Sequence, residues 1–260
     1  MKKQALYLFC CLFSQVLFAQ IKPLPNAHAH NDYEHTRPLF DALEQGFTSV
    51  EADVYLVNGE LYVSHNPPKE LDTKRTLKEL YLNPLQKLVK KNNGKVYAAY
   101  TGIFYLMIDF KTSANETYEL LKEQLTKYPE FQNNPHFVIF ISGNRPIEKI
   151  RTDKSAKLGL DGRPADLGLN IPVSQMPVVS DSFTNVCKWD GNGDIPETER
   201  QKLILLAQKV HAEGKKLRLW ASPDDANAWK VLMDVGVDMV NTDKLADLRK
   251  FLEKYQPAHN

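Results

Sequence analysis

The sequence predicts an α/β fold, specifically a single TIM (β/α)8 barrel, because strand-like and helix-like segments alternate along almost the whole chain. The strand-like segments number eight, and eight parallel strands separated by helices close into a barrel. The chain has 260 residues and 43% hydrophobic content, which is enough for one such domain. We expect this domain to occupy residues 21–260.

Each predicted element is a short apolar run or a run of apolar residues at helical spacing. The predicted strands span 24–30, 47–54, 104–110, 136–142, 158–160, 177–180, 217–221 and 237–241. The predicted helices span 38–45, 77–90, 114–128, 198–212, 225–234 and 245–255. A hairpin follows the second strand, with Asn58-Gly59 as its turn and residues 61–65 returning. Proline and glycine are dense between 151 and 194, so we expect an irregular barrel with long loops between the fifth and sixth strands.

The first twenty residues have the order of a secretory signal. Two lysines precede an apolar run over 5–18, and a small residue, Ala19, closes it. The run is short for a membrane span. We therefore expect cleavage of residues 1–20, export to the periplasm or the extracellular space, and no stable membrane insertion afterwards. Of three cysteines only Cys187 would remain, which excludes an intrachain disulfide.

The charge balance bears on the class of partner. The formal net charge is +1, so no basic excess exists to displace counterions from nucleic acid. We expect a small-molecule substrate and no nucleic-acid partner, and the sequence does not predict an oligomeric state.

Acidic side chains gather where the predicted strands end. Glu51 and Asp53 are two residues apart on one strand, so their side chains point to the same side of the sheet. Two inward carboxylates need a cation or protons between them. The carboxyl ends of barrel strands share one face, which adds Asp109 from the next strand and Asn31 from the first. An all-oxygen set of this kind predicts one divalent cation, Ca²⁺ or Mg²⁺, rather than zinc.

Six motifs in order resemble a known superfamily, the glycerophosphodiester phosphodiesterases and phosphatidylinositol-specific phospholipases C. The resemblance covers about residues 26–250, with a weakly matched middle third. The motifs are His30-Asn31-Asp32-Tyr33, Phe40-Asp41-Ala42-Leu43 with Gly46, Val50-Glu51-Ala52-Asp53-Val54, Val63-Ser64-His65-Asn66, Met107-Ile108-Asp109-Phe110-Lys111, and Leu219-Trp220 with Gly236-Val237-Asp238-Met239-Val240-Asn241-Thr242-Asp243.

The resemblance implies a hydrolase acting on a glycerophosphodiester or a related phospholipid-derived phosphodiester. It makes His30 and His65 the acid/base pair, and it implies attack by the substrate's neighbouring hydroxyl with a cyclic phosphate formed first. Lys111 is the favoured phosphate-binding residue, Arg163 the second, and Trp220 a candidate wall for the substrate. The superfamily's His-Arg-Gly opening is absent, so the basic residue expected beside the first histidine must come from elsewhere.

Two other functions compete with this interpretation. A barrel that binds phosphorylated ligands without catalysis would lack a histidine or an acid, and none is missing. His28-Ala29-His30 is also the opening of zinc amidohydrolases, but their further histidines are not found: His136 begins a strand and His211 lies on a helix. Asp243, like Asn241, is expected to organise the last loop rather than to bind metal.

Overall fold

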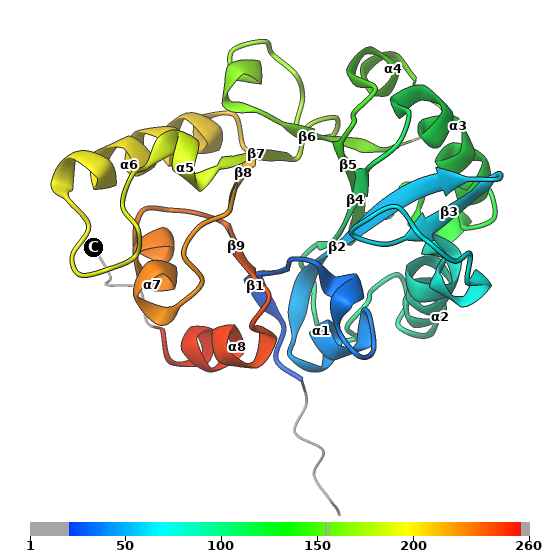
Figure 1. The fold of residues 1–260 in the computed structure, drawn as a ribbon, viewed down its shortest axis with the longest axis horizontal. Helices are drawn as coiled ribbons and strands as arrows, with labels where there is room; N and C mark the ends of the chain where they lie inside the picture. Colours follow the sequence, from blue (N-terminus) through cyan, green and yellow to red (C-terminus); the bar gives the residue numbers. More distant parts are fainter. Residues whose placement is uncertain (1–20, 154, 156, 256–260) are drawn as a thin grey trace, which may run out of the picture.

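Eight parallel strands form a closed ring in the computed structural model, which describes residues 21–153, 155 and 157–255 (Figure 1). The predicted signal peptide, residues 1–20, lies outside the described residues. The ring strands are β1 (Leu24–Ala29), β2 (Phe47–Val57), β4 (Phe104–Phe110), β5 (Phe137–Gly143), β6 (Gly159–Gly162), β7 (Val178–Ser182), β8 (Lys216–Trp220) and β9 (Met239–Thr242). Because β1 pairs with both β2 and β9, the ring of eight strands is closed, and the predicted TIM barrel is confirmed.

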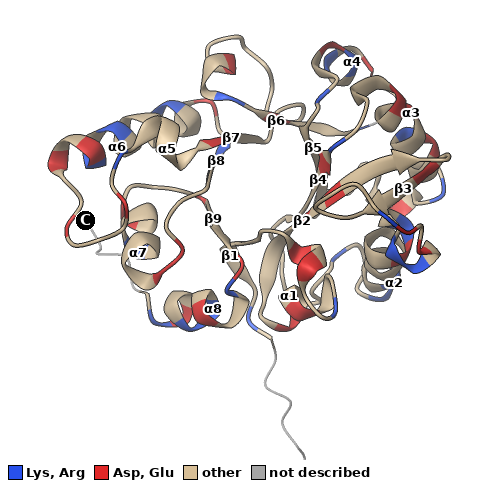
Figure 2. Cartoon of the chain, in the orientation of Figure 1, with Lys and Arg blue, Asp and Glu red and all other residues tan. Residues whose placement is uncertain are grey.

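Helices surround the ring, with basic and acidic residues interspersed over them (Figure 2). They are α1 (Phe40–Glu44), α2 (Asn83–Lys91), α3 (Ala114–Leu125), α4 (Ile147–Thr152), α5 (Phe183–Val186), α6 (Glu197–Ala212), α7 (Ala226–Asp234) and α8 (Leu245–Lys254). Short 3-10 turns occur at Asp32–Glu34, Thr73–Arg75, Pro129–Phe131 and Pro164–Asp166. Within the described part of the chain, no helix combines the length and the apolar character that crossing a bilayer requires.

The helix predicted over 77–90 has two parts. A π-helical turn, Lys78–Leu82, precedes α2, and the N–H of Asn83 donates to the carbonyl of Lys78, five residues back. Pro84 follows at once and has no N–H to donate, so the regular ladder is interrupted at this point.

A β-hairpin extends β2 beyond the ring. β3 (Glu60–Val63) pairs antiparallel with the end of β2 and lies outside the ring near α2 and α3 (Figure 1). The turn residues Asn58 and Gly59 have φ of 49° and 75°, the left-handed conformation that a tight two-residue turn requires at both positions. The predicted hairpin is confirmed, and it brings His65 back toward the ring.

The stretch from β5 to α5 is irregular, and it includes the loops that the sequence predicts between the fifth and sixth strands, which are β6 and β7. β6 has only four residues and pairs through two of them with each neighbour. The two short helices α4 and α5 were not predicted. With six and four residues they are too short to show a helical period in the sequence.

Candidate active site

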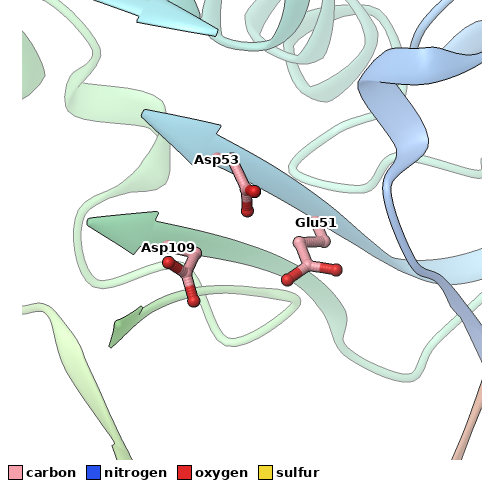
Figure 3. A group of neighbouring side chains, drawn as sticks. All are labelled: Glu51, Asp53 and Asp109. Atoms are coloured by element: carbon pink, nitrogen blue, oxygen red, sulfur yellow. The ribbon is translucent and has the colours of Figure 1, made fainter. Parts of the chain in front are cut away.

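Three carboxylates converge at the carboxyl ends of β2 and β4. Glu51, Asp53 and Asp109 each offer an oxygen, and these oxygens lie within 4.8 Å of one another (Figure 3). Asp53 and Asp109 are direct neighbours in the parallel register, and Glu51 lies two residues before Asp53 on the same face. Ala52, between them, and Val54, which follows Asp53, are buried in the apolar core. The alternation of β2 therefore places both acids on the inner side of the barrel.

The electrostatics of this group suit a cation. Burial raises the pKa of Glu51, and the charges of Asp53 and Asp109 add to the rise although Arg218 and His30 oppose it. Burial likewise raises the pKa of Asp109, with Lys111 acting in the opposite direction. One oxygen, Asp53 Oδ1, is buried and has no hydrogen-bond partner among the described residues. Buried carboxylates with an unsatisfied oxygen fit a divalent cation with oxygen ligands.

Asn31 and Tyr33 join this group from the loop after β1. Asn31 is left-handed (φ 48°), and its backbone N–H donates to Glu51 Oε2 at 3.2 Å. The Tyr33 hydroxyl lies 2.8 Å from Asn31 Oδ1 and 2.6 Å from Asp53 Oδ2. The Asn31 amide oxygen is thus close to the carboxylates, as expected of a fourth ligand. Tyr33 received no role from the sequence, although it stands in the first motif.

The loop that carries Asn31 is supported by a buried acid, Asp32. Asp32 Oδ2 accepts hydrogen bonds from the N–H of Leu39 at 2.6 Å and from the hydroxyl of Tyr81 at 2.8 Å. Burial raises the pKa of Asp32 to about 7, although both hydrogen bonds favour the ionised form. Leu39 has φ 66°, a conformation unusual for leucine, so the bond from Asp32 helps hold a strained turn.

His30 is oriented by an aspartate from the far end of the chain. Its Nδ1 lies 2.8 Å from Asp243 Oδ1, and its Nε2 lies 3.8 Å from Glu51 Oε2. Burial lowers the pKa of His30, but the bond to Asp243 and the charge of Glu51 outweigh it, and the net pKa is raised. The sequence analysis assigned Asp243 to loop organisation only; its contact with His30 joins residues 213 positions apart.

His65 approaches the carboxylates from the hairpin. Its Nδ1 lies 3.2 Å from the Tyr33 hydroxyl and 3.6 Å from Asp53 Oδ2. Its side chain is 58% exposed, against 32% for His30. The two predicted catalytic histidines therefore stand beside the acid group, one near Glu51 and the other near Asp53.

Two basic side chains contact the acids, and one of them was not predicted. Lys111 Nζ lies 3.0 Å from Asp53 Oδ2 and 2.9 Å from Asp109 Oδ1. Burial lowers the pKa of Lys111, but the two carboxylates raise it by more than burial lowers it. The net pKa is raised, so the amine stays charged. Arg218, on β8, is buried; its Nη2 lies 3.8 Å from Glu51 Oε2. The chain lacks the His-Arg-Gly motif, so a basic residue was expected near His30 from elsewhere. Arg218 is such a residue, since its charge acts on His30.

A signal for Arg218 is present in the sequence. Leu217 and Leu219 flank it and are completely buried in the apolar core, so the period of a strand turns Arg218 and Trp220 to the other face. Arg218 Nε donates to Asn241 Oδ1 at 2.8 Å, which satisfies part of this buried cation. A charged residue at an inward position of a barrel strand marks a candidate site residue.

The remaining predicted residues lie apart from the acids. Arg163 pairs with Asp161 at 3.0 Å, and Trp220 is partly exposed at the end of β8. Among the described residues, neither has a hydrogen bond or ion pair to the three carboxylates. His28 is completely buried against Ser49, and burial, Arg218 and His30 keep its pKa well below the usual value. Among the described residues, only the acid group brings three or more candidate metal ligands together, and it contains no histidine.

Comparison with known proteins agrees with this geometry. A family model described as the AIM6-like phosphodiesterase domain matches residues 15–147, half of the chain. The chain belongs to this family. A second model, the glycerophosphoryl diester phosphodiesterase family, matches residues 216–246, where Arg218 and Asp243 lie. The AIM6-like assignment thus places the chain within the superfamily that its motifs resemble.

Individual relatives extend the match beyond the family model. "Altered inheritance of mitochondria protein 6" of Kluyveromyces lactis is 28% identical, over 91% of this chain and 74% of the relative. A homologue of that name from Arthroderma benhamiae is 28% identical, over 86% of this chain and 82% of the relative. A crystal structure of a glycerophosphodiester phosphodiesterase from Parabacteroides distasonis covers 89% of this chain and 98% of its own, with a TM-score of 0.56 and 15% identity. At that identity, the last comparison supports the shared fold.

Proposed function

We propose that this member of the phosphodiesterase family hydrolyses a glycerophosphodiester, or a related phosphodiester derived from phospholipid, with a divalent cation and two histidines. The observation that carries the proposal is the buried acid group of Glu51, Asp53 and Asp109, whose Asp53 Oδ1 has no partner among the described residues. His30 and His65 stand beside that group, where a bound phosphodiester would meet both.

Asn31, Glu51, Asp53 and Asp109 would hold the cation, Ca²⁺ or Mg²⁺. The bound ion would neutralise phosphoryl oxygens and lower the pKa of an attacking hydroxyl. Positive charge from the chain itself comes from Lys111, which contacts two of these acids, and it favours an anionic substrate at this place.

The histidines carry the two proton transfers. One imidazole removes the proton of the substrate's neighbouring hydroxyl, whose oxygen attacks phosphorus. The bond from phosphorus to the departing oxygen breaks, and the other histidine protonates that oxygen. Asp243 fixes the ring of His30 and stabilises its charged form, which either role requires. A cyclic phosphate is the first product of this sequence, and water opens it with the roles reversed.

A substrate screen tests the proposal. Glycerophosphocholine, glycerophosphoethanolamine and glycerophosphoinositol would be incubated with the protein and Ca²⁺ or Mg²⁺, and their products followed by phosphorus NMR. We expect turnover that a chelator abolishes and that Glu51→Gln loses while the fold is kept. Asp181→Asn is the matched control, because Asp181 is a partly buried acid at the end of β7 that, among the described residues, accepts hydrogen bonds from Ser182 and Asn185 alone.

The outcomes separate the competing functions. Full activity of Glu51→Gln in chelator would contradict the metal-dependent mechanism. Binding of phosphodiesters without turnover under any metal condition would favour the inactive phospho-ligand-binding barrel instead.

A further inference from the structure

Two arginines meet at the ends of β5 and β6, apart from the acid group. Arg145 lies two residues after β5, and Arg163 follows β6 directly. Arg163 Nη1 donates to the carbonyl oxygens of Asp161 at 3.2 Å and Gly162 at 2.9 Å. Arg145 Nη1 donates to the same Asp161 carbonyl oxygen. The two guanidinium groups therefore share one acceptor and lie next to each other.

The buried Asp161 side chain does not neutralise this pair. Its Oδ2 accepts from Ser142 Oγ at 2.8 Å and from Arg163 Nη1 at 3.0 Å, and its Oδ1 accepts from Ser180 Oγ at 2.5 Å. The Asp161 carboxylate pairs with Arg163 and both of its oxygens are already engaged, while the charges of Asp166 and Asp109 also act on Arg145. The nearby Asp166 accepts from the backbone N–H of Arg163, not from its guanidinium group.

Both arginines keep donors for a ligand. Across the described part of the chain, neither Nε nor Nη2 of either residue has a hydrogen-bond acceptor, although a guanidinium offers five N–H donors. The Arg163 side chain is 30% exposed, so a ligand can reach it. Burial and the charge of Arg163 lower the pKa of Arg145, as expected of two cations that share one acceptor.

The segment that leads to Arg145 runs beside the acid group. Gly143 ends β5 with φ 67°, and a Cβ built there would lie 2.4 Å from Asp109 Oδ1, so the chain leading to Arg145 passes against that carboxylate. Asp109 is also among the acids that act on the pKa of Arg145. A molecule held at Asp109 would therefore lie beside the segment that leads to Arg145.

We propose that Arg145 and Arg163 form a subsite for a second anionic group, a carboxylate or a phosphate, on the substrate. This inference rests on the proposed function, in which the cation and Lys111 already serve the reacting phosphodiester. Planar guanidinium forks bind carboxylate and phosphate oxygens through paired hydrogen bonds, and an arriving anion relieves the repulsion between two adjacent cations. The substrate class is then a phosphodiester with a further negative charge on one of its alcohols.

Two pairs of product-like ligands test the subsite by calorimetry on the Mg²⁺- or Ca²⁺-loaded protein. Phosphoserine and phosphoethanolamine differ by one carboxylate, and propane-1,3-diol bisphosphate and monophosphate differ by one phosphate. We expect the more anionic member of at least one pair to bind about tenfold more tightly, the scale of one charge-assisted hydrogen bond. Arg145→Gln should bring that ratio close to one. Arg151→Gln, in an exposed ion pair with Glu148 on α4, should keep it.

Arg163→Lys guards against a folding defect in the first variant, because lysine keeps the charge beside Asp161 but loses the fork. It should reduce the ratio as well. A ratio near one for both pairs in the wild type, or a ratio that Arg145→Gln leaves unchanged, would overturn the subsite. Ligand binding needs no turnover, so a preserved ratio without any hydrolysis of diesters would count against the proposed function alone.

Discussion

The strand ends of β1 to β4 and those of β5 to β8 hold different kinds of polar groups. In the first half, Glu51, Asp53 and Asp109 crowd together, and one buried oxygen among them lacks a partner. In the second half, the buried Asp161 has a donor for each oxygen, and the groups with spare hydrogen-bonding capacity are arginines. Figure 2 shows acidic colouring at β4 and basic colouring near β8 on the other side of the ring.

The difference separates two tasks. Partly unsatisfied acids beside histidines can bind a cation and move protons, which is chemistry on the reacting group. A buried acid whose hydrogen bonds are complete can hold arginines in place, and their guanidinium groups can then bind an anionic group of the substrate. That is selection of the substrate. Substitutions in the first half should therefore change the rate, and substitutions in the second half should change the preference between substrates.

The histidine pair should give the largest effect. His30→Ala and His65→Ala should each lower turnover of a glycerophosphodiester by roughly 10²–10⁴-fold, the usual contribution of a positioned acid or base. The double variant should lose far less than the product of the two, because the residues act as a unit. Turnover at saturating metal measures this. His28→Asn is the control: it should retain most of the rate, since His28 bonds to Ser49. Loss of activity in the His28 variant, together with normal activity in the His65 variant, would favour the zinc amidohydrolase interpretation instead.

The pairing of His30 with Asp243 should give the next effect. Asp243→Asn removes the charge that raises the pKa of His30, so the limb of the pH–rate profile that belongs to His30 should move to lower pH. Turnover at neutral pH should fall by about ten- to a hundredfold, because the ring also loses its orientation. Asp247→Asn, an exposed acid on α8, is the control. A pH–rate profile that Asp243→Asn leaves unchanged would mean that Asp243 only organises the last loop.

Cation affinity should depend on pH. Because the pKa values of Glu51 and Asp109 are raised, protons compete with the cation at higher pH than at ordinary carboxylates. Affinity should fall as the pH falls, by up to about a hundredfold between pH 7.5 and 5.5 if one proton is displaced over the whole range. Calorimetric titration of Mg²⁺ or Ca²⁺ at the two values measures it. Equal cation affinities at the two pH values would contradict the contrast between the partly unsatisfied acids of the first half and the satisfied Asp161 of the second.

Replacing a buried acid by asparagine should change folding stability in opposite directions in the two halves, represented by Asp32 and Asp161. Of the predictions made here, this one involves the smallest effect on the catalytic rate. The Asp32 pKa is raised from 3.8 to about 7, so between these two pH values the unfolded chain releases a proton that the folded state keeps, and stability falls until about pH 7 and then levels off. The stability of the wild type relative to Asp32→Asn should fall by about 2–3 kcal/mol from pH 5 to pH 8. Urea unfolding without metal measures this. Asp161→Asn should instead lose stability at pH 8, because Asp161 pairs with Arg163. A pH-independent difference for Asp32→Asn would be contrary to this expectation.

Prediction from sequence succeeded where neighbours along the chain determine the geometry. The alternation of strands and helices is enough for the barrel, and the spacing of Glu51 and Asp53 is enough to place both on one side of β2. The site residues at the ends of β1 to β4 were predicted for the same reason, because they stand in short contiguous motifs.

It failed where contacts join distant segments. His30 meets Asp243 only because the ring closes between β1 and β9, which no local pattern encodes. The meeting of Arg145 with Arg163 depends on loop conformations around the four-residue strand β6. Arg218 was visible in the alternation of its strand, but its partner Glu51 lies on β2 and could not be inferred.

The hairpin after β2 gives one half of the histidine pair a separate support. His65 lies just beyond β3, a strand that pairs only with β2 and takes no part in closing the ring. Successive side chains of a strand alternate between faces, so a shift of the hairpin by one residue would turn His65 away while the ring stayed closed. Closure of the barrel therefore does not depend on the hairpin, whereas the position of the second histidine does.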